Sequence, residues 1–140
     1  MRDRRRAAAT ILAALASLLG ACGARSEGPQ TIAWDREPCG HCRMLVGEKQ
    51  YAAQAIGLDG RAVTFDDPGC LFTWLDQGGE AKTIWLHHLR EERWLRAPSV
   101  AFVETERSPM GYRLGAVDPG TAGALGWDDA RRQVAASRSR

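Results

Sequence analysis

Two short apolar runs joined by a tight turn signal most constrain how this chain can fold. Residues 51–56 and 61–65 are rich in strand-forming and small apolar residues, and the segment Gly-Leu-Asp-Gly at 57–60 lies between them. An Asp-Gly pair between two such runs is a strong signal for a β-hairpin. The sequence therefore predicts an antiparallel hairpin over residues 51–65, beside which the next elements must pack.

A helix is expected directly after the hairpin. Asp66 or Asp67 can cap its N-terminus, Pro68 suits its first turn and Gly78 suits its exit. The apolar residues in between recur at helical spacing on one face: Leu71, Phe72 and Leu75. Residues 82–88 then resemble a strand that can return beside the hairpin, which gives the order ββαβ.

A looser version of the same order follows in the second half. Residues 93–95, 100–104 and 110–117 are expected to be extended, and residues 127–136 are expected to be helical. The predicted fold class is α+β, with two small ββαβ-type units whose antiparallel sheets are each covered by a helix.

The first 21 residues have the pattern of a signal peptide. Arginines at positions 4–6 precede a short apolar stretch, and Leu-Gly-Ala-Cys follows at positions 19–22. This run resembles the bacterial lipoprotein signal, in which the chain is cut before the cysteine and the thiol is acylated. We therefore expect a removed signal over residues 1–21, a lipid on Cys22, a flexible tether over residues 22–36 and a folded domain over residues 37–137. A plain signal peptide that leaves Cys22 free is the alternative.

Charge argues against a nucleic-acid partner. The whole chain has a net charge of +2, but residues 1–21 hold four of its 19 basic residues and one of its 17 acidic ones, so the remainder carries −1. A phosphate-binding surface requires a basic surplus. The signal and its anchor predict a location on the periplasmic side of a bacterial membrane. The outer membrane is favoured because position 24 is Ala and not Asp, the common inner-membrane retention cue.

Three cysteines, Cys39, Cys42 and Cys70, lie in the predicted domain. An odd number in an oxidising compartment cannot form a complete set of disulfides, so a thiol is left over or the thiols serve chemistry. Residues 39–44, Cys-Gly-His-Cys-Arg-Met, combine two thiols with a thioether, and these soft donors favour Cu(I) over hard cations. A structural zinc site rarely uses methionine and needs a second Cys/His pair, which Cys70 and the histidines at 87–88 offer only at a poor spacing.

The Cys-x-x-Cys spacing also fits a periplasmic thiol-disulfide oxidoreductase, which is the alternative function. Such proteins place the first cysteine at a helix N-terminus after a buried strand. Here charged residues 35–37 precede Cys39, and Gly47 and Glu48 interrupt any helix after Cys42, so that context is absent. A structural lipoprotein whose cysteines simply pair is a further alternative.

Four segments in this order resemble the nitrous oxide reductase accessory lipoproteins (NosL). They are Cys-Gly-His-Cys-Arg-Met at 39–44, Tyr-Ala-Ala-Gln at 51–54, Phe-Asp-Asp-Pro-Gly-Cys at 65–70 and Ser-Pro-Met-Gly-Tyr at 108–112. The resemblance covers roughly residues 37–117 and extends to the lipoprotein signal. It implies a membrane-tethered periplasmic Cu(I) carrier that is not an enzyme and whose fold has two ββαβ units. It further implies two partners, nitrous oxide reductase and its membrane transporter complex, during assembly of the copper–sulfur centre.

The resemblance also assigns the copper ligands. The family's Cys-x-Met falls on Cys42 and Met44, and its Pro-Met-Gly-Tyr methionine falls on Met110. Apart from the initiator, these are the only two methionines in the chain. Cys39 is either an extra ligand or a partner that oxidises with Cys42 and switches copper binding off.

The other candidate side chains are expected to have structural roles. His41 is expected to be a solvated loop histidine that can also offer nitrogen to copper, and Cys70 a buried core thiol. His87 and His88 follow one another on a predicted strand and should point to opposite faces, which argues against chelation by both.

Overall fold

The computed structural model describes residues 27–139, so the predicted signal peptide and the predicted lipidation site Cys22 lie outside the described residues. The described elements, in chain order, are the 3-10 helix η1 (Lys49–Tyr51), β1 (Ala53–Ile56), β2 (Ala62–Phe65), α2 (Pro68–Asp76), β3 (Thr83–His87), β4 (Trp94–Arg96), β5 (Ala101–Glu104), β6 (Leu114–Val117) and α3 (Trp127–Arg138). None of these helices is both long and apolar enough to cross a membrane.

The first four strands form one antiparallel sheet in the order β2-β1-β3-β4. The predicted hairpin is confirmed as β1 and β2, with Ala53 opposite Phe65. Strand β3 returns on the other side of β1, where Ala53 also lies opposite Leu86. All four residues of β1 are buried because this central strand has neighbours on both edges and α2 packed on it.

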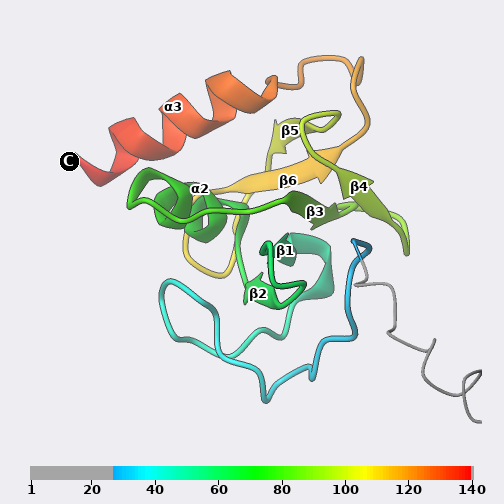
Figure 1. Cartoon of the computed structure of the whole chain (residues 1–140). Coiled ribbons are helices and arrows are strands. Elements are labelled where there is room, and N and C mark those ends of the chain that lie inside the picture. Colours follow the sequence, from blue (N-terminus) through cyan, green and yellow to red (C-terminus); the bar gives the residue numbers. More distant parts are fainter. Residues whose placement is uncertain (1–26, 140) are drawn as a thin grey trace, which may run out of the picture.

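Strands β5 and β6 form a second, two-stranded antiparallel sheet. Helix α2 contacts β1 and β2 of the first sheet and β6 of the second, while α3 packs on α2 and β5 (Figure 1). Phe72 joins these layers, since its ring makes edge contacts with Phe102 at 5.4 Å and with Trp127 at 4.8 Å between centroids. Large apolar side chains therefore form one core through both sheets.

The predicted α+β class is confirmed, but the strands divide four and two between the sheets. Strand β4 pairs with β3 across the short turn after His87 and does not join β5. Two contacts hold it there: the Trp94 ring meets the His87 ring edge-on at 5.3 Å, and Leu95 is buried. Strand β6 is shorter than predicted, because residues 110–113 belong to a loop.

The segment before the site is attached to the sheet. Residues from 27 on were predicted as part of a flexible tether, yet the Glu27 carbonyl accepts hydrogen bonds from Thr83 Oγ1 and Trp85 Nε1. The Gln30 N–H donates to Gln54 Oε1 at 2.7 Å, and Ile32 is buried in the core. The chain therefore reaches the cysteine-containing loop as a packed segment.

Candidate metal site

Residues 39–44 form a closed turn at the edge of the first sheet. The turn is bracketed by a β-bridge between Pro38 and Leu45, and the Cys39 N–H donates to the Met44 carbonyl at 2.7 Å. Arg43 has φ +69°, a left-handed conformation that is uncommon for a residue other than glycine. This conformation folds the chain back so that the thiols of Cys39 and Cys42 lie on the same side of the turn.

Gly40 allows this turn to approach β2. Its N–H donates to the Thr64 carbonyl at 2.8 Å, and a Cβ at this position would overlap the Val63 side chain. A glycine is therefore required between the two cysteines by close packing.

The junction between β2 and α2 supplies the other half of the site. Asp67 is the N-cap of α2, as predicted, and its Oδ1 accepts from the Gly69 N–H at 2.9 Å. Pro68 occupies the first turn, where its missing N–H costs no hydrogen bond. Asp66 precedes the cap and Cys70 lies in the first turn, so both side chains reach the closed turn of residues 39–44.

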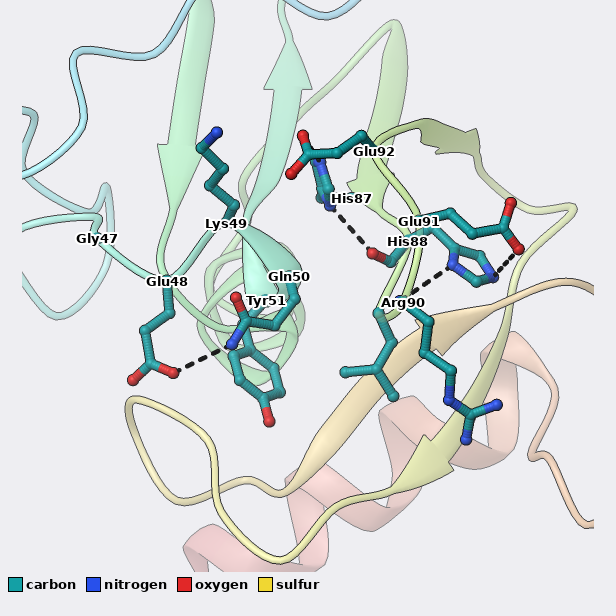
Figure 2. A pocket seen from close by; sticks show the side chains of 11 residues that line it. Gly47, Glu48, Lys49, Gln50, Tyr51, His87, His88, Arg90, Glu91 and Glu92 are labelled. Atoms are coloured by element: carbon teal, nitrogen blue, oxygen red, sulfur yellow. Dashed lines mark hydrogen bonds and ion pairs between the residues drawn. The ribbon is translucent and has the colours of Figure 1, made fainter.

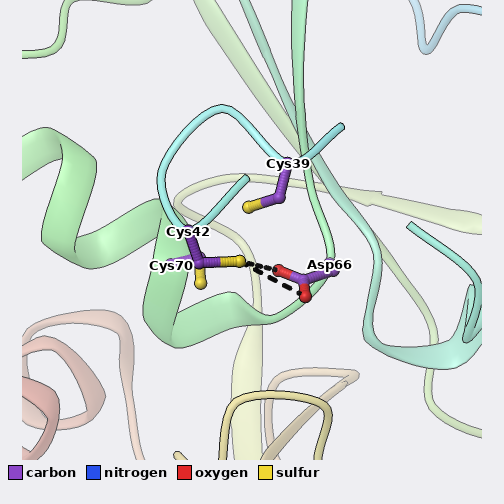
Figure 3. A group of neighbouring side chains, drawn as sticks. All are labelled: Cys39, Cys42, Asp66 and Cys70. Carbon is purple, nitrogen blue, oxygen red and sulfur yellow. Dashed lines mark hydrogen bonds between the residues drawn. The ribbon is translucent and has the colours of Figure 1, made fainter. Parts of the chain in front are cut away.

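Cys39, Cys42, Asp66 and Cys70 come together as one group (Figure 3). One potential ligand atom from each side chain lies within 4.8 Å of all the others. Cys42 Sγ is 3.4 Å from Asp66 Oδ1 and 3.5 Å from Oδ2. Cys39 and Cys70 are fully buried and Asp66 is 2% exposed, whereas Cys42 is partly exposed. The group is a buried pocket of donor atoms with one thiol toward the surface.

The three thiols have very different affinities for protons. A hydrogen bond with Cys70 lowers the pKa of Cys39 to about 6, against the effect of burial, and the backbone N–H groups of Asp66 and His41 lower it further. Burial raises the pKa of Cys42 to about 12. The same hydrogen bond with Cys39, together with burial, raises the pKa of Cys70. At neutral pH the group therefore holds one buried thiolate, that of Cys39, and two protonated thiols, those of Cys42 and Cys70.

Cys42 and Cys39, two of the four predicted copper ligands, are thus in the group. The other two, Met44 and Met110, have side chains that are 60% and 41% exposed. The backbones of both methionines form hydrogen bonds close to the group. The Met44 carbonyl accepts from the N–H of Cys39, a member of the group. The Met110 N–H donates at 3.0 Å to Oδ2 of Asp67, the residue after Asp66. His41, also partly exposed, lies in the turn between the two cysteines.

The loop that carries Met110 is held by the helix cap. Asp67 Oδ2 also accepts from Ser108 Oγ at 2.6 Å, and burial raises the pKa of this carboxyl. The ring of Tyr112 lies against Gly69, where a Cβ would overlap it. Segments joined by contacts that span 41 to 43 residues of the sequence, around 68 and 110, are therefore fixed beside each other.

Sequence reasoning missed Asp66 as a possible ligand, and it predicted Cys70 as a core residue after weighing it as a zinc ligand only at a poor spacing. Cys70 is indeed buried in the core, and its thiol also belongs to the group. The available signal was the spacing Asp66–Cys70, because residues four apart straddling a helix start can face the same neighbour.

A second group, His88, Glu91 and Asp118, brings suitable atoms together. Two of its members, His88 and Glu91, line a pocket (Figure 2). Here Arg93 already pairs with both carboxylates and lowers their pKa values. The Arg90 N–H donates to His88 Nδ1, so the neutral ring carries its proton on Nε2, the nitrogen that faces the acids. This group is therefore an ion-pair network in which Arg93 already occupies both carboxylates.

Comparison of the chain with protein-family models, curated proteins and solved structures gives no match. Fold and site together define an α+β protein in which three cysteines and an aspartate can hold a metal ion.

Proposed function

We propose that this protein is a membrane-anchored periplasmic metallochaperone, not an enzyme, that carries Cu(I) for the assembly of nitrous oxide reductase. The observation that carries the proposal is the convergence of Cys39 and Cys42 with the segments that bear Met44 and Met110. Thiolates and thioethers are the donors that Cu(I) prefers. The lipid on Cys22 and the two partners, the reductase and its copper and sulfur transporter complex, come from the sequence resemblance and belong to the proposal.

The exposure of the ligands suits a carrier. Cys39 is buried and its lowered pKa leaves it ready to bind a cation at neutral pH, while Cys42 reaches the surface. Met44 and Met110 offer exposed thioethers. An acceptor can then replace the outer ligands one at a time while Cys39 still holds the ion. A lipid anchor would confine this exchange to the membrane surface.

One observation favours the alternative, a thiol-disulfide oxidoreductase. The pKa of Cys39 is lowered to about 6, as the attacking cysteine of such an enzyme requires. However, Cys39 is fully buried, and the thiol that reaches solvent, Cys42, has its pKa raised to about 12. The reactive thiolate is thus inaccessible and the accessible thiol is protonated, which is the reverse of what disulfide exchange needs.

Anaerobic titration of the reduced protein with Cu(I) against a competing chelator tests the copper proposal. We expect one Cu(I) per chain, lost in Cys42→Ser and weakened in Met44→Leu and Met110→Leu, which remove only the thioether sulfur. Leu45→Ala is the matched control, because Leu45 is an exposed apolar residue of the same loop.

Stoichiometric Cu(I) binding that survives Cys42→Ser contradicts the ligand assignment. Catalytic reduction of insulin disulfides that is lost in Cys39→Ser and indifferent to Met110→Leu supports the oxidoreductase instead.

A further inference from the structure

Asp66 is a buried carboxylate without a cationic partner. Among residues 27–139 no basic side chain forms an ion pair with it. The donors to its carboxylate are weak ones, cysteine thiols, of which that of Cys42 lies at 3.4 and 3.5 Å. Its neighbour Asp67 is satisfied by Gly69, Ser108 and Met110. A buried carboxylate costs much free energy unless it is paired or binds a metal ion, so Asp66 faces a place where a cation is favoured.

The turn of residues 39–44 is shaped to support thiolates bound to a metal. The backbone N–H of His41 lowers the pKa of Cys39 and that of Met44 lowers the pKa of Cys42, each from two residues beyond the cysteine. Such N–H groups spread the charge of metal-bound thiolates and orient them.

We propose that Cys39, Cys42, Cys70 and Asp66 form a tetrahedral site for a divalent thiophilic cation, with Zn²⁺ as the ion that fits it best. Zinc binds sulfur at about 2.3 Å and carboxylate oxygen at about 2.0 Å, so a tetrahedral site has sulfur–oxygen edges of about 3.5 Å and sulfur–sulfur edges of about 3.8 Å. The two observed distances from Cys42 Sγ to the Asp66 oxygens, 3.4 and 3.5 Å, match the first edge. The ligand atoms of the group all lie within 4.8 Å of one another, so the sulfur atoms would have to approach by at most about 1 Å to reach the sulfur–sulfur edge of a zinc site.

The donor set distinguishes this ion from other cations. Mg²⁺ and Ca²⁺ require several oxygen ligands, and the group has a single carboxylate. Cu(I) prefers sulfur ligands and gains little from Asp66, whereas Zn²⁺ accepts thiolate and carboxylate together. Asp66 therefore selects for the divalent ion, and Met44 and Met110 select for Cu(I).

The proposed zinc site shares Cys39 and Cys42 with the proposed copper site. The zinc proposal does not depend on whether the protein carries copper. Because the thiols are shared, the two ions exclude each other. A zinc-loaded protein would have residues 39–44 closed onto α2. Copper loading would release Zn²⁺ and exchange Asp66 and Cys70 for the methionines.

Paired titrations of the reduced full chain, purified in detergent and stripped with chelator, test this inference. Zn²⁺ is titrated against a chromophoric chelator, and Cu(I) is titrated anaerobically, for the wild type, Asp66→Asn, Cys70→Ser and Met110→Leu. We expect one Zn²⁺ per chain, weakened by about 10-fold to 100-fold or more in Asp66→Asn and Cys70→Ser and unchanged in Met110→Leu. Cu(I) binding should show the opposite dependence on Asp66→Asn and Met110→Leu.

Spectroscopy of the wild-type protein tests the site without relying on variants, which can fail to fold. Co²⁺ as a probe should give the intense visible bands and sulfur charge-transfer absorption of a tetrahedral thiolate site, and added Zn²⁺ should abolish them. An octahedral Co²⁺ spectrum, or Zn²⁺ binding that is indifferent to both Asp66→Asn and Cys70→Ser, overturns the zinc site. Loss of Cu(I) binding alone overturns only the proposed function.

Discussion

Loading the reduced protein with one Zn²⁺ ion is expected to release about two protons at pH 7 and about three at pH 5. Metal-bound cysteines are thiolates, so each protonated thiol that becomes a ligand gives up one proton. Cys42, whose pKa is raised to about 12, and Cys70, whose pKa is also raised, each contribute a whole proton at both pH values.

Cys39 makes the difference between the two conditions. With a pKa of about 6 it is about nine-tenths thiolate at pH 7 and about nine-tenths protonated at pH 5, so its contribution rises from about 0.1 to about 0.9 proton. Three thiols with the ordinary pKa of about 8.5 would release close to three protons at either pH.

Isothermal titration calorimetry in pairs of buffers with different ionisation enthalpies measures this count directly. Cys70→Ala is the informative variant, because it removes the thiol whose hydrogen bond lowers the pKa of Cys39. It should release nearly two protons at both pH 5 and pH 7, from the two remaining thiols, so the rise from about two protons at pH 7 to about three at pH 5 that is expected of the wild type should disappear. A wild-type release of three protons at pH 7 would refute the proposed sharing of a thiolate within the group.

Three further predictions concern the framework of the site. Phe72→Ala should lower the free energy of unfolding by about 3–5 kcal/mol in urea titrations, because the ring of Phe72 fills the core against Phe102. Burial raises the pKa of Asp67 in the folded state above the ordinary aspartate value of about 3.9. The folded state therefore binds the extra proton, and wild-type stability should fall as pH rises from this ordinary value through the pKa of the folded state. Urea midpoints of Asp67→Asn should lack this component of the pH dependence. Gly69→Ala should displace the Tyr112 ring, cost about 1–3 kcal/mol and speed hydrogen exchange in the loop of residues 108–112.

The local elements of the fold were predictable because their signals lie within a few residues of each other. The hairpin follows from the Asp-Gly turn, and α2 follows from the cap at Asp67, Pro68 and the apolar spacing after it. Strand β4 was harder, because Trp94 and Leu95 are equally compatible with either sheet. Its partner is decided by packing against His87, which is a tertiary contact and leaves no local pattern.

The candidate site was predictable only in part for the same reason. The spacing of Cys39, Cys42 and Met44 within one turn indicates soft-metal chemistry directly. Cys70 offers no such signal, since a cysteine in the first turn of an amphipathic helix is an ordinary core residue until the facing segment is known. The bond between Gly40 and β2 is what brings the closed turn over α2, and it joins residues 24 apart in the sequence.

Asp66 and Asp67 show most clearly what a sequence cannot decide. The two are chemically identical neighbours at the end of β2, and successive side chains at a strand end point in opposite directions. A slip of one residue in the helix start would exchange their roles, so that Asp66 would cap α2 and Asp67 would face the thiols. Gly69 fixes the choice, because the Tyr112 ring can lie close to the helix only where a Cβ is missing, and this contact brings the Ser108–Met110 loop to Asp67. Asp66 is then left with weak thiol donors, Cys42 among them, and a cation becomes its favourable partner.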